Sequence, residues 1–371
     1  MAALVVSADS HVMEPPTLWT ERLDRKFQDK APKVVQNESG TFQFVAPGIV
    51  PFPVAAGFGI GKSGAELKEH LTKGYEAARP SGWDPAERLK DQDVDGVRAE
   101  VLYTTLGMPL FGLDDTELQQ VCFSVFNDWL GEYASYAPKR LYPIALISLE
   151  DVEAGVRELE RCAKIGFKGA MIWGAPPEDR PYSKPLYDPF WAAAQETGIP
   201  ISLHVITQKK QTEIRFDGGN RTGRPPLDPI FEIQQSLRAL IYGGALERFP
   251  RLKIVSAEND AGWIGHYMHR LDHIHEKFIS MTKRGSQLAM LPSAYLRRQL
   301  WATFQDDPLA PITAKFFGED NFMWASDFPH TDSTWPHSQE VIERDFAGVS
   351  EAVKRKIVCD NAVKLYGIKV D

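Results

Sequence analysis

The chain has 371 residues, 43% of them hydrophobic and 25% charged, which is the composition of an ordinary globular protein. A formal net charge of −8 argues against nucleic acid or an anionic membrane as the partner, so we expect a small-molecule ligand. The cysteines Cys122, Cys162 and Cys359 form no CxxC pair, which indicates free thiols in a reducing compartment. The sequence shows neither a signal peptide nor a membrane span, so we expect a cytoplasmic protein.

Short apolar runs alternate with helical stretches along the whole chain, which is the pattern of βα units around a parallel sheet. Eight runs are predicted strands: residues 4–10, 97–104, 141–148, 169–173, 200–205, 252–257, 299–304 and 322–326. Most are almost continuously apolar, as expected of strands that are covered on both faces. The α/β pattern therefore predicts a distorted (β/α)8 (TIM) barrel, with residues 1–371 as a single domain.

The helical periodicity is clearest in two connecting segments. Residues 151–164 carry an apolar stripe, begin with acidic residues and end before Gly166, and residues 228–248 carry a similar stripe. Two other segments are long and irregular, residues 12–96 and 207–228. We interpret 12–96 as an insertion or lid after the first strand, and both segments as part of the C-terminal mouth of the barrel. The GFGIG run at 57–61 lies outside a βαβ unit, so we interpret it as a flexible turn.

Active sites of such barrels form where the strands end, and four of the predicted strands end in side chains that can bind a metal. The first strand runs VVSADSH and offers Asp9 and His11, which lie two residues apart and therefore share a face. The fifth, sixth and eighth strands supply the other candidates: His204, Glu258, Asp327 and, three residues later, His330.

Each of these residues also has a structural explanation when it is considered alone. Asp327 could cap a helix, His204 could be a hydrogen-bonded core histidine, and Glu258 could form an ordinary ion pair. Their coincidence at the strand ends instead predicts a divalent metal site, and imidazole with carboxylate suits Zn, Mn or Fe. The expected ligands are Asp9, His11, His204, Glu258 and Asp327.

A further group of histidines follows the sixth strand. His266, His269 and His273 are three and four residues apart, so they share one face of a helix. The zinc motif HExxH is absent because Arg270 follows His269, and we interpret these histidines as surface or packing residues.

Several segments carry a resemblance to a known family: RLYP at 140–143, GFKG at 166–169, WASDFPH at 324–330 and DNAVKLYG at 360–367. Together with the strand ends, they resemble the amidohydrolase superfamily over nearly the whole chain. The branch is the one that contains aminocarboxymuconate-semialdehyde decarboxylase. In that family the metal is held by a first-strand HxH, the fifth-strand histidine and the eighth-strand aspartate. The resemblance implies that the Asp9/His11 pair, His204 and Asp327 are ligands.

The chain departs from the family pattern at two strand ends. Asp9 stands in place of the first histidine, and an acidic residue there also occurs in related decarboxylases. Glu258 stands where the sixth strand usually offers a histidine that acts as a catalytic acid/base or a metal ligand. Three carboxylates with two histidines form a harder ligand set than typical zinc hydrolases use, which favours iron or manganese. With His330 added, the set could hold two ions.

The resemblance implies a metal-dependent decarboxylase or hydrolase that acts on a cyclic or aromatic small molecule with a carboxylate or carbonyl group. The catalytic residues for proton transfer are expected to be Asp327, Glu258 and His330. The expected substrate contacts are Phe58, Trp173, Phe328 and Trp335, with Arg215 or Arg221 for an acidic group.

Two other functions remain open at this point. A non-heme di-iron oxygenase on the same barrel would use Glu258 as a full ligand. A binding barrel without chemistry would tolerate the change Asp327→Asn without loss of function. We also expect a homodimer, because dimers are the commonest symmetric oligomers.

Overall fold

The computed structural model describes residues 4–70, 72–210, 229–283 and 285–370, and it contains all eight predicted strands. They form one sheet whose spatial order follows the chain: β1 (Val5–His11), β5 (Val97–Tyr103), β6 (Leu141–Leu146), β7 (Gly169–Ile172), β8 (Ile201–His204), β9 (Ile254–Ala257), β10 (Leu300–Phe304) and β11 (Phe322–Trp324). Each strand pairs in parallel with the next.

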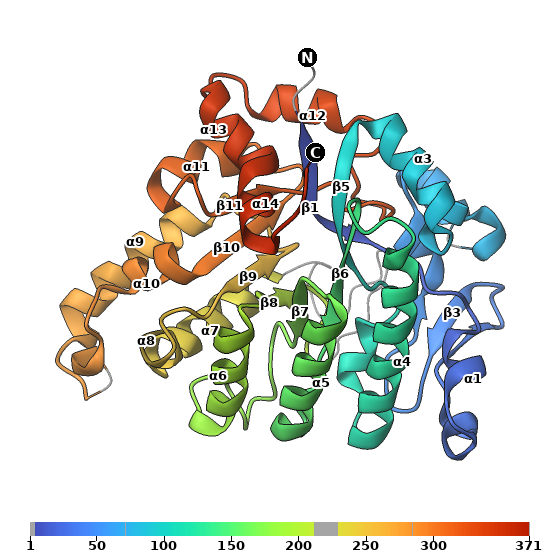
Figure 1. The fold of residues 1–371 in the computed structure, drawn as a ribbon, viewed down its shortest axis with the longest axis horizontal. Helices are drawn as coiled ribbons and strands as arrows, with labels where there is room; N and C mark the ends of the chain where they lie inside the picture. Colours follow the sequence, from blue (N-terminus) through green and yellow to red (C-terminus); the bar gives the residue numbers. More distant parts are fainter. Residues whose placement is uncertain (1–3, 71, 211–228, 284, 371) are drawn as a thin grey trace.

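The first and last strands approach each other and nearly close the sheet into a barrel (Figure 1). The N–H of Asp327 donates to the carbonyl of Asp9 at 3.0 Å, and the N–H of His11 donates to the carbonyl of Phe328 at 2.6 Å. On the β11 side these bonds involve the residues just after the strand, so the segment that carries Asp327 joins the last strand of the sheet to the first. The fold is the distorted (β/α)8 barrel that the alternation of strands and helices predicted.

Helices surround the barrel (Figure 1). The α-helices are α1 (Leu18–Arg22), α2 (Gly64–His70), α3 (Pro85–Asp95), α4 (Thr116–Ser135), α5 (Val152–Ile165), α6 (Asp188–Thr197), α7 (Pro229–Tyr242), α8 (Ala245–Arg248), α9 (Ile264–Ile274), α10 (Pro292–Gln299), α11 (Leu309–Phe317), α12 (Ser338–Asp345), α13 (Glu351–Arg355) and α14 (Asn361–Tyr366). Shorter 3-10 turns are η1 (Arg25–Lys30), η2 (Val54–Phe58), η3 (Tyr75–Ala77), η4 (Pro80–Gly82), η5 (Pro109–Gly112), η6 (Pro185–Tyr187) and η8 (Gly285–Gln287). Two single π-helical turns are η7 (His275–Ile279) and η9 (Lys356–Asp360).

One of the two periodic segments forms the expected helix, and the other is divided. Helix α5 begins at Asp151, whose side chain accepts a hydrogen bond from the N–H of Ala154 at 3.1 Å, and ends at left-handed Gly166. The prediction of one helix over 228–248 is wrong, because the chain turns at Gly244 (φ 77°) and separates α7 from α8. Position 228 itself lies outside the described residues.

The segment 12–96 contains a second sheet that the sequence did not predict. Strands β2 (Lys33–Gln36), β3 (Phe42–Val45) and β4 (Phe52–Pro53) pair antiparallel in this order. The interpretation of 57–61 as a flexible turn is wrong at its start. Gly57 belongs to η2 and packs on the barrel, where an added Cβ would lie 2.4 Å from Thr105 Cγ2.

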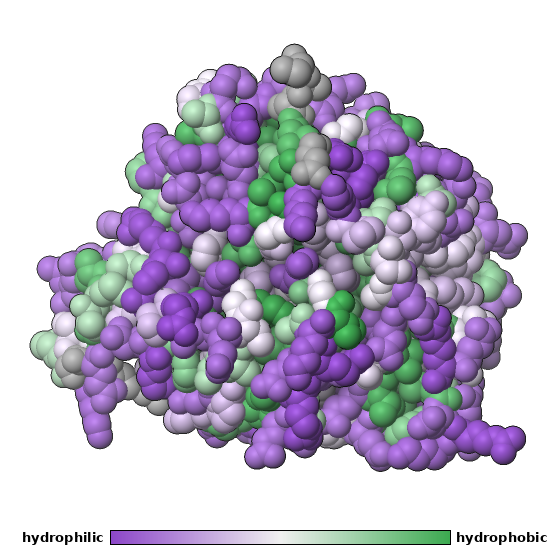
Figure 2. Space-filling model, viewed as in Figure 1, coloured by the Kyte–Doolittle hydropathy of each residue, from purple (hydrophilic) through white to green (hydrophobic). Residues whose placement is uncertain are grey.

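Apolar residues from the barrel and from the segment 12–96 contribute to one continuous core. All three cysteines are free and buried, as their spacing indicated. The face drawn in Figure 2 is mainly hydrophilic, with apolar residues in small separate patches. Within the described part of the chain, no helix is long and apolar enough to cross a membrane.

Candidate metal centre

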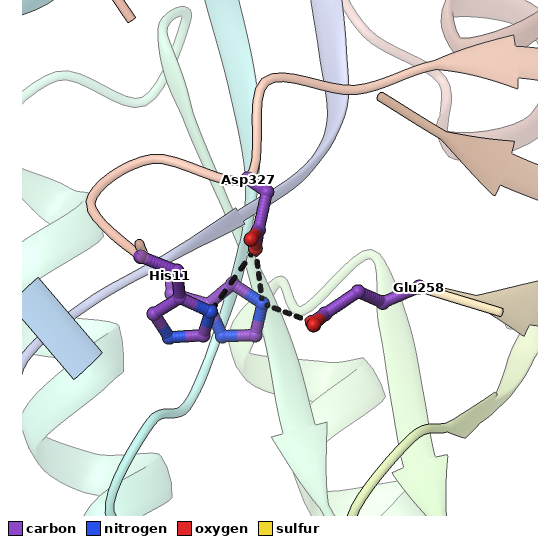
Figure 3. Close-up of side chains that lie close together, drawn as sticks. His11, Glu258 and Asp327 are labelled. Atoms are coloured by element: carbon purple, nitrogen blue, oxygen red, sulfur yellow. Dashed lines mark ion pairs between the residues drawn. The ribbon is translucent and has the colours of Figure 1, made fainter. Parts of the chain in front are cut away.

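The five expected ligands meet at the C-terminal ends of the strands. The central atom of the cluster is Nε2 of His11, which lies 3.3 Å from Oε2 of Glu258 and 3.3 Å from Oδ1 of Asp327. Figure 3 shows the two carboxylates approaching His11 from different segments. Oδ1 of Asp9 is 3.5 Å from the same nitrogen. Nε2 of His204 completes the group, at 3.3 Å from Glu258 Oε2 and 3.7 Å from Asp9 Oδ1.

The atoms that face this centre have no hydrogen-bond partner, although all of them are buried. They are Asp9 Oδ1, His11 Nε2, His204 Nε2, Glu258 Oε2 and both carboxylate oxygens of Asp327. Buried polar atoms normally have partners, so a group of them that converges on one point indicates a ligand-binding site. Two overlapping groups bring their ligand atoms close enough to hold an ion: His11, Glu258, Asp327 and His330, and Asp9, His11 and His204. Imidazole nitrogen and carboxylate oxygen together suit a divalent cation.

The outward atoms of the same residues are held in place. Nδ1 of His11 lies 2.7 Å from the carbonyl of Thr104, and Nδ1 of His204 lies 2.9 Å from the carbonyl of Val205. A carbonyl can only accept, so each Nδ1 carries the proton and each Nε2 directs its lone pair into the centre. This is the outer-shell arrangement that orients metal-binding histidines.

The pKa values of these groups reflect the crowding of charges. Burial opposes ionisation of Asp9, but its contacts with His11 and His204 outweigh burial and lower the pKa to about 2. Burial likewise opposes charging of His11, yet Asp9 and Glu258 raise its pKa well above the ordinary value. Burial and the nearby charge of Glu258 raise the pKa of Asp327 well above its usual range. A divalent cation in the centre would take the place of these protons.

Two of the carboxylates stand on a left-handed backbone. The φ angles of Glu258 and Asp327 are 53° and 54°, and the other non-glycine residues with positive φ are Ile206 and Asp260, among the residues with assigned structure. All four follow the ends of β8, β9 and β11. Strain of this kind gathers at functional sites.

His330 lies next to the cluster, and its hydrogen bonds define its protonation. Thr105 Oγ1 donates to the carbonyl of Val12 at 2.7 Å and lies 2.9 Å from Nε2 of His330. The hydroxyl proton is thereby used, so Nε2 of His330 must donate. Its Nδ1 then faces Oδ1 of Asp327 at 3.1 Å. Burial, together with the charges of His11 and other neighbours, lowers the pKa of His330 well below the usual value.

Arg88 of α3 is a residue of the site that the sequence did not reveal. It is fully buried, and its Nε and Nη2 bond both carboxylate oxygens of Glu100 at 2.7 and 3.1 Å. Its Nη1 donates to the carbonyl of His11 at 2.7 Å, and the guanidinium lies over the ring of Phe328. The insertion therefore holds β1 and the segment after β11 together behind the ligands.

The expected substrate contacts and the remaining histidines are placed differently. Phe58, Trp173 and Phe328 are buried in packing contacts, and half-buried Trp335 donates from Nε1 to the carbonyl of Asp91. Neighbouring side chains cover these rings, and their role as substrate contacts stays a prediction. Arg215 and Arg221 lie outside the described residues. His266 and His269 are exposed, as predicted.

Comparison with known proteins identifies the class. The family model described as amidohydrolase matches residues 11–368, and the chain belongs to this family of metal-dependent enzymes. A gamma-resorcylate decarboxylase from Polaromonas sp. is 25% identical over 257 residues, which cover 65% of this chain and 74% of the relative. A 2-amino-3-carboxymuconate-6-semialdehyde decarboxylase from Dictyostelium discoideum is 22% identical over 301 residues and 77% of each chain.

Solved structures share the fold. An amidohydrolase from Mycobacterium avium subsp. paratuberculosis matches with a TM-score of 0.79 and 22% identity, over 100% of this chain and 99% of that one. A dihydroxybenzoic acid decarboxylase from Polaromonas sp., solved with bound manganese and 2-nitroresorcinol, has a TM-score of 0.69 and 19% identity over 100% and 98%. The relatives named as enzymes of known activity are decarboxylases, so they support carboxy-lyase chemistry and give no support to the oxygenase. They also name manganese rather than iron.

Proposed function

We propose that the protein is a decarboxylase of a small aromatic carboxylate that depends on one divalent ion, with manganese as the natural metal. The observation that carries the proposal is the convergence of buried donor atoms without a hydrogen-bond partner at the mouth of the barrel, from Asp9, His11, His204, Glu258 and Asp327. The decarboxylase relatives support the reaction class, and the manganese in a structural neighbour supports the metal.

The geometry favours one ion over two. The ligand atoms of Asp9, Glu258 and Asp327 lie 3.3–3.5 Å from His11 Nε2, so a single cation about 2.0–2.2 Å from each donor can contact these four residues. A pair of ions about 3.5–4 Å apart would need a second set of donors. His330 belongs to one candidate group with His11, Glu258 and Asp327, but it would add only one donor, and its Nε2 faces Thr105.

Proton delivery falls to the chain itself. When bound, the ion supplies positive charge that polarises a substrate oxygen. Replacing a ring carboxylate by hydrogen requires one proton at the ring carbon, after which the C–C bond breaks, its electron pair returns to the ring and CO2 leaves. His330 is placed to carry this proton, because its Nδ1 lies 3.1 Å from Oδ1 of Asp327 at the edge of the centre and Thr105 fixes the orientation of its ring.

The direct test is turnover of hydroxybenzoates that carry a carboxylate beside a hydroxyl group. Protein loaded with Mn2+ should release CO2, and Asp327→Asn should abolish release, whereas the exposed-site variant His269→Asn should retain it. A product formed by addition of water to the substrate, without release of CO2, would favour the hydrolase instead. Oxygen uptake with two irons per chain would favour the oxygenase.

The oligomeric state and the location of the protein are also proposals. We infer a homodimer, and a stripe on α11 that exposes Leu309, Ile312 and Phe316, each more than half accessible, supports an association surface. Sedimentation velocity should give one species of twice the chain mass; a monomer at micromolar concentration would contradict the proposal. The reducing location rests on the three free cysteines and stays a prediction.

A further inference from the structure

Strand β10 lies between two strands that lead to ligands, yet it supplies no ligand itself. Its neighbours β9 and β11 lead to Glu258 and Asp327. The side chain that β10 places at this point is Thr303, which is fully buried. Its Oγ1 lies 3.0 Å from Oδ2 of Asp9 on β1 and 3.0 Å from the backbone nitrogen of Glu258.

The direction of both hydrogen bonds follows from the groups involved. The backbone N–H of Glu258 can only donate, so the Thr303 oxygen accepts it. The threonine hydroxyl has one proton, and it donates this proton to Oδ2 of Asp9. One hydroxyl thus links the backbone of one ligand to the side chain of another.

This link determines which atoms face the centre. Oδ2 of Asp9 is occupied by Thr303, so Oδ1 is the oxygen that remains for an ion. The N–H anchor also holds Glu258 in its left-handed conformation (φ 53°), from which Oε2 reaches both histidines. The turn after Glu258 has a second anchor. Asp307, four residues after Thr303, accepts hydrogen bonds from the N–H groups of Ala261 and Gly262 at 3.0 and 2.7 Å.

We propose that Thr303 is a positioning residue of the metal centre: its hydroxyl sets the orientation of Asp9 and Glu258 together and thereby determines the affinity for the ion. The inference rests on the five-residue centre proposed above. It assigns the effect to the hydroxyl, not to the methyl group or to the volume of the side chain, so the two contributions can be separated by substitution.

The experiment is a titration of metal-free protein with Mn2+, in which the electron paramagnetic resonance signal of the free ion is counted. Thr303→Val removes the hydroxyl at constant volume and should weaken Mn2+ binding by about 10–100-fold, as loss of an outer-shell partner does. Thr303→Ser keeps the hydroxyl and should bind within about threefold of the wild type, since its outer-shell bond is kept. Thr334→Val is the matched control, because Thr334 is buried and its hydroxyl bonds that of Ser338 rather than a ligand residue.

The outcomes separate the inference from the centre on which it rests. If the wild type binds no Mn2+, both fail. If the wild type binds and Thr303→Val binds equally well, or Thr303→Ser is as weak as Thr303→Val, the positioning role alone is refuted. If Thr303→Val does not fold, Thr303→Cys replaces it. The thiol is a weak donor, so the Cys variant should bind Mn2+ more weakly than the Ser variant and more tightly than the loss of at least tenfold expected for Thr303→Val. Binding equal to the wild type would again refute the role.

Discussion

Replacing Arg88 by methionine should destabilise the fold strongly, because it leaves the buried carboxylate of Glu100 without its cation. The side chains of both residues are almost inaccessible, at 0% and 3%, and the ion pair is bidentate. Breaking a buried pair from one side costs about 3–5 kcal/mol, which is roughly a 10²–10⁴-fold change in the unfolding equilibrium. The carbonyl of His11 loses a donor in the same variant.

A second variant shows whether the uncompensated charge is the cause. Glu100→Gln removes that charge, and the amide oxygen can still accept from Gln92. The double variant with Arg88→Met should therefore be much less destabilised than the sum of the single variants.

Urea unfolding, followed by circular dichroism, measures both effects. The exposed bidentate pair of Arg22 and Glu132 provides the control, and Arg22→Met should cost less than about 1 kcal/mol. If Arg88→Met costs no more than Arg22→Met, or if the two buried substitutions are additive, the reasoning about the buried pair is refuted.

Three further predictions concern the site and the segment 12–96. His330→Asn should lower kcat by about 10²–10⁴-fold with little change in Mn2+ affinity, in steady-state kinetics paired with metal analysis; an unchanged kcat would contradict the proton-transfer role. Mn2+ affinity should rise with pH, because His11 and Asp327 have raised pKa values and the ion must displace their protons. Calorimetry in buffers of different ionisation enthalpy should detect the release of these protons, and binding without proton release would contradict the prediction. Gly57→Ala should destabilise the protein by about 1–3 kcal/mol in urea unfolding, since its Cβ would clash with Thr105; wild-type stability would show that η2 can shift freely.

The barrel was predictable because each of its strands corresponds to a short apolar run that can be recognised without tertiary contacts. Strand β1 is entirely buried, and its VVSADSH sequence shows both the apolar run and the two ligands that end it. The ligands could be found without tertiary information, since the ends of parallel strands meet at one edge of a barrel. The second sheet was not predictable in the same way, because β2 and β3 are only four residues long and largely half-exposed, and β4 ends in a proline.

The supporting residues of the site depend on tertiary contacts. Arg88 belongs to a helix of the insertion, and only the packing of α3 on the barrel shows that it reaches His11. The tautomer of His330 likewise follows from Thr105, which is distant in the sequence. The failed helix over 228–248 had a local signal, the adjacent Gly243 and Gly244, but the continuous apolar stripe outweighed it.

The stoichiometry and affinity of metal binding test the central claim most directly. Metal-free protein titrated with Mn2+ should bind one ion per chain, measured by plasma mass spectrometry after removal of free ion. The variants His204→Asn and Asp327→Asn should each lose most of that affinity, while the exposed His269→Asn keeps it. Full binding in either ligand variant, or two ions per wild-type chain, would contradict the single five-residue centre.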